Sequence, residues 1–259
     1  MSWQRKVGAV IVALVALAAV VSLVWTPYDP LQTEVAARLQ GSSPAHWMGT
    51  DQFGRDIASR VMDGARLTLT VAVGAVALSG LIGVPLGIWA GMRRGASRVV
   101  MAGADLLLAF PALLLAIVFT AVFGASIWIV VLAIGIAGIP AFVRVARAGT
   151  MQVMQRDYIL AARIAKVSGP AIAWRHVLPN IWPLVLTQVS VAVALAILAE
   201  AGLSFLGLGA PAPYASWGRM LQASQPYLAT SPHLALWPGA AIALTMLGFN
   251  LLGNADDRR

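Results

Sequence analysis

The chain has 259 residues, of which 59% are hydrophobic and only 11% are charged, and its formal net charge is +8 at pH 7. A soluble domain carries about a quarter charged residues, so this composition is typical of a bilayer protein and excludes an ordinary soluble enzyme. The absence of cysteine excludes disulfides, thiol catalysis and cysteine-based zinc sites.

Six apolar stretches are long enough, or nearly so, to cross about 30 Å of hydrocarbon as helices. They predict membrane spans at residues 7–25, 67–91, 99–123, 127–143, 183–203 and 234–253. Arg5 and Lys6 precede the first stretch, as in a signal peptide, but that run is too long for one and no cleavage site clearly follows, which favours a retained anchor. A three-residue gap at 124–126 predicts a tight hairpin between the third and fourth spans.

The basic residues predict the orientation of these spans, because cytoplasmic loops carry an excess of Arg and Lys. Placing both termini in the cytoplasm puts most of the 18 basic residues inside. We therefore expect an all-α membrane protein with six transmembrane helices and both ends inside. The positive charge is then an orientation signal, which argues against a nucleic-acid partner.

The spans divide the chain into four parts. These are an N-terminal tail with the first helix at 1–25, an external loop at 26–66, a transmembrane core at 67–253 and a cytoplasmic tail at 254–259. Inside the core, Pro85, Pro111 and Pro140 interrupt predicted spans and are expected to kink them. Gly83 and Gly87, with Gly91, recur every four residues on one helix face, which favours close helix packing.

The cytoplasmic segment 144–182 is too polar to span and too regularly patterned to be a linker. Small and apolar residues repeat along it at helical spacing, namely Met151, Met154, Tyr158, Ala161, Ala162 and Ala165. Ser168, followed by Gly169 and Pro170, predicts a stop and a new helix, which Pro179 and Asn180 are expected to end. Such a helical pair can lie on lipid headgroups or dock into a cytoplasmic partner, and the two adjacent alanines favour docking.

The segment 157–163, with Ser168-Gly169 and 175–180, resembles the EAA loop of ABC-importer permeases. Its ending, RHVLPN, is similar to that of the dipeptide/oligopeptide/nickel group. Further blocks resemble the C-type permease of that group and occur in the family order, at 46–56, 64–69, 110–117, 200–209 and 216–218. The chain is thus identified as a member of that group, a type I ABC importer permease.

The resemblance implies a multi-pass permease of the bacterial plasma (inner) membrane that imports dipeptides or oligopeptides. It implies a related B-type permease as heterodimer partner, two cytoplasmic ATPase subunits or domains, and an external peptide-binding protein. No Gly-x-x-x-x-Gly-Lys-Ser/Thr phosphate loop occurs in the chain. We therefore expect no enzyme activity and no cofactor here, with ATP and Mg held by the ATPases.

Two alternatives remain open. The same machinery can import nickel, another metal chelate or another small solute, since cargo choice rests largely on the binding protein. A stand-alone channel or secondary transporter is the alternative of a different class. It predicts charges near the midplane and inverted repeats, neither of which is visible in the sequence.

The resemblance also implies which residues couple the permease to an ATPase. They are Tyr158, Ala161, Ala162, Arg163, Ser168, Gly169, Arg175, His176, Leu178, Pro179 and Asn180. The segment departs from the family pattern where Leu160 takes the place of a Glu and Lys166 that of a Gly. A Lys there disfavours a left-handed turn, unless Gly169 serves that need.

Three residues are candidates for the translocation path: Asp105, Glu200 and Ser204. Asp105 is a carboxylate inside a predicted span, which is a functional-site hypothesis by default. Its nearness to the cytoplasmic helix end favours pairing with an Arg. For Glu200, a hydrogen bond that fixes the following turn is favoured over binding of a peptide amine. No residue set predicts a metal site, because each of the three histidines lacks a second ligand at suitable spacing.

Overall fold

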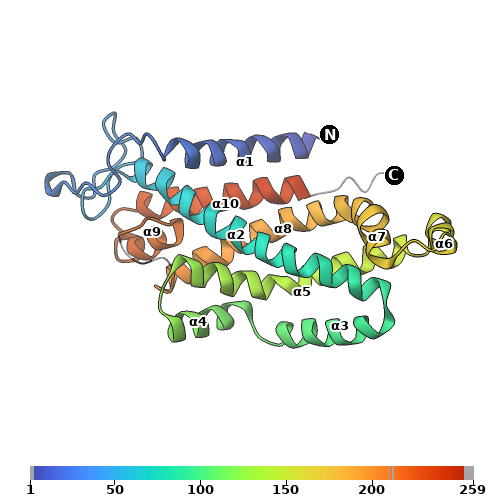
Figure 1. The fold of residues 1–259 in the computed structure, drawn as a ribbon. Helices are drawn as coiled ribbons and strands as arrows, with labels where there is room; N and C mark the ends of the chain where they lie inside the picture. The colour runs from blue at the N-terminus through green and yellow to red at the C-terminus, as the bar shows by residue number, and fades with distance from the viewer. Residues whose placement is uncertain (1–2, 210, 212, 254–259) are drawn as a thin grey trace.

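The computed structural model describes residues 3–209, 211 and 213–253, and the regular elements in this part of the chain are helical (Figure 1). The predicted tail at 254–259 lies outside the described residues. The helices are α1 (Trp3–Val21), η1 (Val35–Ala37), α2 (Ile57–Met92), α3 (Arg94–Leu108), α4 (Ala112–Phe123), α5 (Ile127–Val153), α6 (Asp157–Ile164), α7 (Gly169–Ile172), the π-helical turn η2 (Ala173–Val177), α8 (Leu178–Phe205), α9 (Trp217–Ser224), η3 (Gln225–Tyr227) and α10 (His233–Gly253).

The long helices form a bundle in which α1, α10, α8, α2 and α5 run side by side, with α3 and α4 along one edge (Figure 1). Five helices in the described residues are long and apolar enough to cross a membrane: α1, α2, α5, the stretch Gly169–Phe205 and α10. The number reaches six if α3 and α4 together make one span. The fold class is therefore confirmed as all-α with five to six candidate spans.

The third predicted span, 99–123, is not one helix. It consists of α3 and α4, which are bent by 80° relative to each other. Pro111 stands at the break, where it lacks the N–H that would continue the helix and disfavours helical backbone at the residue before it. Pro85 and Pro140 instead lie within the unbroken helices α2 and α5.

The hairpin between α4 and α5 is confirmed. Gly124 ends α4 with a φ of 85°, which a residue with a Cβ rarely adopts, and its N–H bonds the carbonyl of Thr120 at 3.0 Å. Ser126 then occupies the N-cap position of α5 in extended backbone conformation. The reversal places α4 against α5.

The glycine stripe of α2 packs against α5 of the same chain. A Cβ on Gly87 would lie 2.6 Å from the carbonyl oxygen of Val143 and 2.7 Å from the Cβ of Ala146. A Cβ on Gly83 would lie 2.6 Å from the Cβ of Phe142, and Gly91 meets α5 in the same way. The prediction of close helix packing is therefore confirmed, with α5 as the partner helix.

Replacing Gly87 with Ala is expected to destabilise the bundle by about 1–3 kcal/mol, because the added methyl group meets backbone that cannot move away alone. Gly103→Ala is the matched control, since Gly103 also lies inside a helix and a Cβ there meets nothing within 4 Å. Thermal unfolding in detergent, followed by helical circular dichroism, measures both. A Gly87→Ala protein as stable as the control would contradict the close approach of α2 and α5.

The segment predicted to be an external loop, residues 26–66, is held to the start of α2 by side-chain contacts. Asp56 occupies the N-cap of α2, and its Oδ2 accepts a hydrogen bond from the N–H of Ser59 at 2.8 Å. Its Oδ1 lies 2.9 Å from Nδ1 of His46, so this histidine has a carboxylate partner that its spacing in the sequence did not predict. Asp51 pairs with Arg55 at 2.6 Å. These contacts start α2 at Ile57, well before the predicted span begins at residue 67.

The segment 144–182 differs from its prediction in two ways. First, α5 continues without a break to Val153, and the predicted helix that includes Met151 and Tyr158 is interrupted before α6 begins at Asp157. Second, the helix that begins at Gly169 does not end at Pro179 and Asn180. It runs through the π-helical turn into α8, so the prediction of a separate second helix is wrong.

Proline placement explains this continuity. The N–H of Leu178 bonds the carbonyl of Ala173, five residues back, which widens the turn just before Pro179. Pro179 follows directly after this turn, so the bond that its missing N–H cannot make falls at the irregular turn and not within the regular part of α8. Ser168 does take the predicted N-cap position of α7, with Pro170 in the first turn, although the Ser168 side chain makes no capping hydrogen bond.

Candidate functional site

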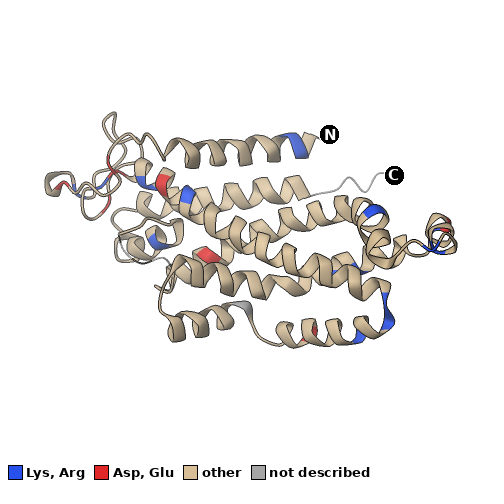
Figure 2. Cartoon of the chain, in the orientation of Figure 1, with Lys and Arg blue, Asp and Glu red and all other residues tan. Residues whose placement is uncertain are grey.

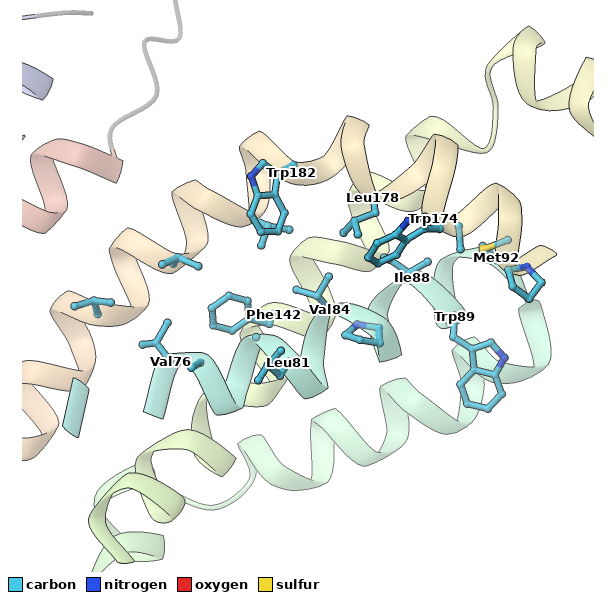
Figure 3. A pocket seen from close by; sticks show the side chains of 18 of the residues that line it. Val76, Leu81, Val84, Ile88, Trp89, Met92, Phe142, Trp174, Leu178 and Trp182 are labelled. Atoms are coloured by element: carbon cyan, nitrogen blue, oxygen red, sulfur yellow. The ribbon is translucent and has the colours of Figure 1, made fainter. Parts of the chain in front are cut away.

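An open groove of about 1060 Å³ lies between α2 and α8, in the half of the bundle next to α7 (Figure 3). Its walls come from α2, α5, α7, the π-helical turn, α8 and α10 and are almost entirely apolar. Figure 3 shows Trp174 and Trp182 projecting from the π-helical turn and α8 toward α2. Trp89 adds a third indole, and Arg93 contributes the guanidinium group of the lining.

The groove was missed in the sequence analysis, although its walls have a periodicity that could have revealed it. On α2, Val73, Ala77, Leu81, Pro85 and Trp89 recur every four residues, and all of them line the groove. Along the other wall Trp174, Leu178 and Trp182 repeat in the same way. Such stripes mark one helix face each, but only the fold shows that the two faces enclose a common space.

Glu200 and Ser204 lie in a buried polar cluster outside the groove lining. Glu200 is 1% exposed, and its carboxylate accepts hydrogen bonds from Thr68 Oγ1 at 3.1 Å and Ser204 Oγ at 2.6 Å. Ser216 contributes a third side-chain interaction. The cluster therefore joins α2, α8 and the segment before α9, as expected of a carboxylate that fixes the following turn.

Asp105 lies apart from that cluster, on α3. Its Oδ1 accepts a hydrogen bond from Nη2 of Arg144 on α5 at 2.7 Å, with both side chains more than half exposed. Nearby, Nε of Arg147 donates to Oγ of Ser97 at 2.9 Å. Both contacts link α3 to α5, so the pairing of Asp105 with an Arg agrees with the favoured interpretation.

The residues predicted to couple the chain to an ATPase gather at the end of the bundle that carries α6 and α7 (Figure 1). Within α6, Ala162 is buried together with Ile159, whereas Ala161 and Arg163 are exposed. Ala162 and Ile159 belong to the same apolar cluster as Ile172 of α7. The two adjacent alanines thus have different surroundings: Ala162 packs against its own chain, and only Ala161 is open to another molecule.

A second set of contacts ties α6 to the π-helical turn and α8. The ring of Tyr158 lies 6.1 Å from that of His176, and Asn180 Nδ2 donates to the carbonyl of His176 at 2.6 Å. Arg175, Pro179 and Asn180 are exposed, and Leu178 lines the groove, as does Gly169. The predicted coupling residues and one wall of the groove are therefore parts of one continuous segment of the chain, from α6 to α8.

Lys166 itself adopts the left-handed conformation, with a φ of 56°. Its N–H bonds the carbonyl of Arg163 at 3.0 Å, and the N–H of Val167 bonds that of Ala162 at 3.0 Å, which together form a Schellman motif that ends α6. Gly169 has no positive φ and starts α7, so the expectation that Gly169 could serve this turn is wrong.

Lys166→Gly is expected to stabilise the end of α6 by about 1 kcal/mol, because glycine adopts the left-handed conformation without the steric cost of a Cβ. Lys166→Ala is the control, since it removes the charge but keeps the Cβ. Hydrogen exchange of the Val167 amide reports on the bond to Ala162. Equal protection in the two variants would show that the charge, and not the backbone, determines this turn.

Comparisons with known proteins were made for the whole chain. The family described as "Binding-protein-dependent transport system inner membrane component" matches residues 83–255. The dipeptide transport system permease protein DppC of Alkalihalophilus pseudofirmus is 38% identical over 249 residues, which cover 96% of this chain and 82% of that protein. The glutathione transport system permease protein GsiD of Pectobacterium atrosepticum is 41% identical, over 88% of this chain and 76% of that protein.

Two further similarities extend the comparison. The nickel transport system permease protein NikC of Escherichia coli is 33% identical over 98% of this chain and 92% of that protein. Among solved structures, an amino acid ABC transporter with histidines matches with a TM-score of 0.55 at 17% identity, over 75% of this chain and 91% of that chain. At that identity the structural match shows a shared fold alone.

Proposed function

The chain belongs to the family of binding-protein-dependent transport system inner membrane components, and on this premise we propose that it is a permease subunit of an ABC importer for dipeptides and other short peptides. The observation that carries the proposal is the match to a dipeptide permease over 96% of the chain. The unbroken connection from α6 to the groove also supports the proposal. An importer that is driven by cytoplasmic ATPases needs a rigid link from its cytoplasmic surface to the translocation path.

In this proposal the end of the bundle that carries the start of α1, the end of α10 and α6 faces the cytoplasm (Figure 1). Figure 2 supports this orientation, since Lys and Arg residues gather at that end around α3, α6 and α7. The opposite end, with the loop before α2 and with α9, faces outward. The bent pair α3 and α4 completes a set of six spans, with its break inside the membrane covered by neighbouring protein.

The groove is this chain's half of the translocation path, and a related B-type permease closes it from the open side. The walls support this assignment because large apolar side chains of α2 and α8 are exposed there, among them Leu81, Trp89 and Trp182. A partner helix packed at hydrocarbon depth would bury them. Glu200 and Ser204 then hold the outer end of the spans together, outside the path itself.

Two cytoplasmic ATPase subunits or domains bind and hydrolyse ATP with Mg, and one of them docks on α6. Because the ring of Tyr158 on α6 lies beside that of His176 on the π-helical turn, and Ile159 and Ala162 are buried in the apolar cluster of the bundle, a displacement of α6 is expected to move Gly169 and Trp174 in the groove wall. ATP-driven closure of the ATPases thus shifts the groove between inward-open and outward-open forms. An external peptide-binding protein delivers the cargo to the outer end.

The proposal is tested by affinity purification of the full chain from its native membrane in mild detergent, with mass spectrometry of what stays bound. We expect a second permease, one or two ATPase chains and a peptide-binding protein. A nickel-binding protein in place of the peptide-binding protein would assign the alternative cargo that the match to NikC supports. A chain that purifies alone in several detergents would contradict the proposal and favour a channel or secondary transporter.

A further inference from the structure

The apolar groove between α2 and α8 carries charge of one sign. Arg93 lines it directly after the end of α2, and the described residues of the lining include no Asp, Glu or His. Arg94 and Arg98, the next basic residues along the chain, do not line the groove, so membrane orientation is enough to explain them. An anionic group of a ligand therefore finds a partner in this groove, whereas a cationic group finds none.

The guanidinium group of Arg93 is available to such a ligand. The side chain is exposed, and among the described residues no carboxylate pairs with it. A guanidinium presents its N–H groups in a planar fork that matches the two oxygens of a carboxylate. The apolar walls beside Arg93 strengthen this contact, because they exclude water that would screen the charges. Arg93 is thus suited to the C-terminal carboxylate of a peptide.

The same end of the groove presents the indole of Trp174. Figure 3 shows this side chain projecting from the π-helical turn toward the last turns of α2, where Ile88 and Met92 also line the groove. Trp174 is 72% exposed, so the core of the bundle does not bury it. The bond from the N–H of Leu178 to the carbonyl of Ala173 widens the turn, and π-helical turns are frequent at functional sites. Trp174 therefore offers an open aromatic surface to an apolar side chain.

On the basis of the proposed function, we propose that this end of the groove holds a subsite for the C-terminal residue of the peptide. Arg93 binds the carboxylate, and Trp174 contacts an apolar side chain next to it. The end of α2 faces the cytoplasm in the proposed orientation, so the peptide crosses with its C-terminus leading. The subsite favours peptides with a free carboxylate and a large apolar C-terminal side chain. A free metal cation finds no carboxylate or imidazole ligand among the described residues of the lining.

The test uses the full chain assembled with its partner permease and the ATPases in nanodiscs, without ATP. It measures equilibrium binding of the radiolabelled dipeptide alanyl-phenylalanine and of its C-terminal amide, which lacks the carboxylate. The binding protein is omitted, so that its own preference does not enter the measurement. The wild-type complex is expected to bind the acid about tenfold or more tightly than the amide, because hydrogen bonds between charged groups are strong.

Arg93→Gln is expected to remove the preference for the acid and to leave binding of the amide unchanged. The Arg93 side chain is exposed, so this variant is expected to fold. Arg94→Gln is the matched control, since it removes the same charge from the next residue, which lies outside the groove lining, and it should keep the preference.

Trp174→Ala is expected to weaken binding of alanyl-phenylalanine about fivefold, because the aromatic contact to the phenylalanine ring is lost. Binding of alanyl-alanine should not change. Trp128→Ala is the control for loss of an exposed indole, since Trp128 is 69% exposed and lies outside the groove lining.

Equal binding of the acid and the amide by the wild-type complex, or binding of neither, would overturn the inference. It would also be overturned if Arg93→Gln kept the preference or if Arg94→Gln lost it, since the overall charge would then be responsible. If Trp174→Ala weakened binding of both dipeptides alike, the indole would not belong to the subsite. Failure of the proposed function is distinct, because the wild-type complex would then import no dipeptide when ATP and the binding protein are supplied.

Discussion

Replacing Ala162 with Glu is expected to abolish ATP-driven uptake while the chain remains in the membrane at its normal level. Ala162 is 9% exposed and belongs to the buried apolar cluster of the bundle. Burying an unpaired carboxylate in that position costs several kcal/mol of folding free energy, so α6 is expected to lose its packing against the bundle. The link from α6 to the groove is then lost. Uptake of labelled dipeptide into proteoliposomes measures the effect, and the amount of chain in the membrane fraction measures insertion.

Ala161→Glu is the matched control, because the neighbouring alanine is exposed and the added charge is the same. Hydrogen exchange distinguishes the two variants: the amides of α6 lose protection with Ala162→Glu and keep it with Ala161→Glu. Normal uptake by the Ala162→Glu protein would contradict the assignment of α6 as the coupling element. Equal protection in the two variants would show that α6 does not depend on this buried contact.

The second large effect is expected for Glu200→Leu, which should lower the free energy of unfolding by about 2–4 kcal/mol. Leucine fills the space but leaves the hydroxyl groups of Thr68 and Ser204 without the carboxylate that accepts their hydrogen bonds. Because the cluster joins α2 to α8, its loss is expected to loosen the packing of these two helices. Thermal unfolding of the purified chain in detergent measures the change.

Glu200→Gln separates this structural role from cargo binding. Glutamine keeps the size and one acceptor oxygen, so we expect a loss below about 1 kcal/mol and nearly normal uptake. If Glu200→Gln abolished uptake in a stable, fully assembled complex, the negative charge itself would be required. Binding of a peptide amine would then replace the structural interpretation.

Long apolar runs made the bundle predictable from sequence, because a chain cannot leave such runs in water or leave backbone unpaired in lipid. The close packing of Gly83 and Gly87 could be predicted from local sequence, because their spacing of four residues places both on one helix face. The helix against which they pack could not be predicted. Whether it belongs to α5 or to a second subunit depends on the tertiary fold. The sequence predicts that Pro111 interrupts the third span. A proline alone does not tell a kinked helix from the break between α3 and α4 that the structure shows.

The resemblance to the EAA loop predicts a coupling role for the segment 144–182, but the internal structure of this segment could be known only from the fold. Periodicity does not reveal that α5 ends at Val153, because the residues on both sides of the break share one helical pattern. Ala161 is exposed and Ala162 is buried because of the way α6 lies in the fold, which is a non-local effect. The left-handed Lys166 was unexpected because tertiary packing can offset the cost of a Cβ in that conformation.

The central claim is that this chain is one of the two membrane subunits of an ATP-driven importer. Its most direct test is uptake of labelled dipeptide into proteoliposomes that contain this chain, its partner permease and the ATPases, with the binding protein supplied outside and ATP inside. The account predicts uptake that requires ATP hydrolysis and every component. Uptake by this chain alone, without ATP, would contradict it and identify a channel or a secondary transporter.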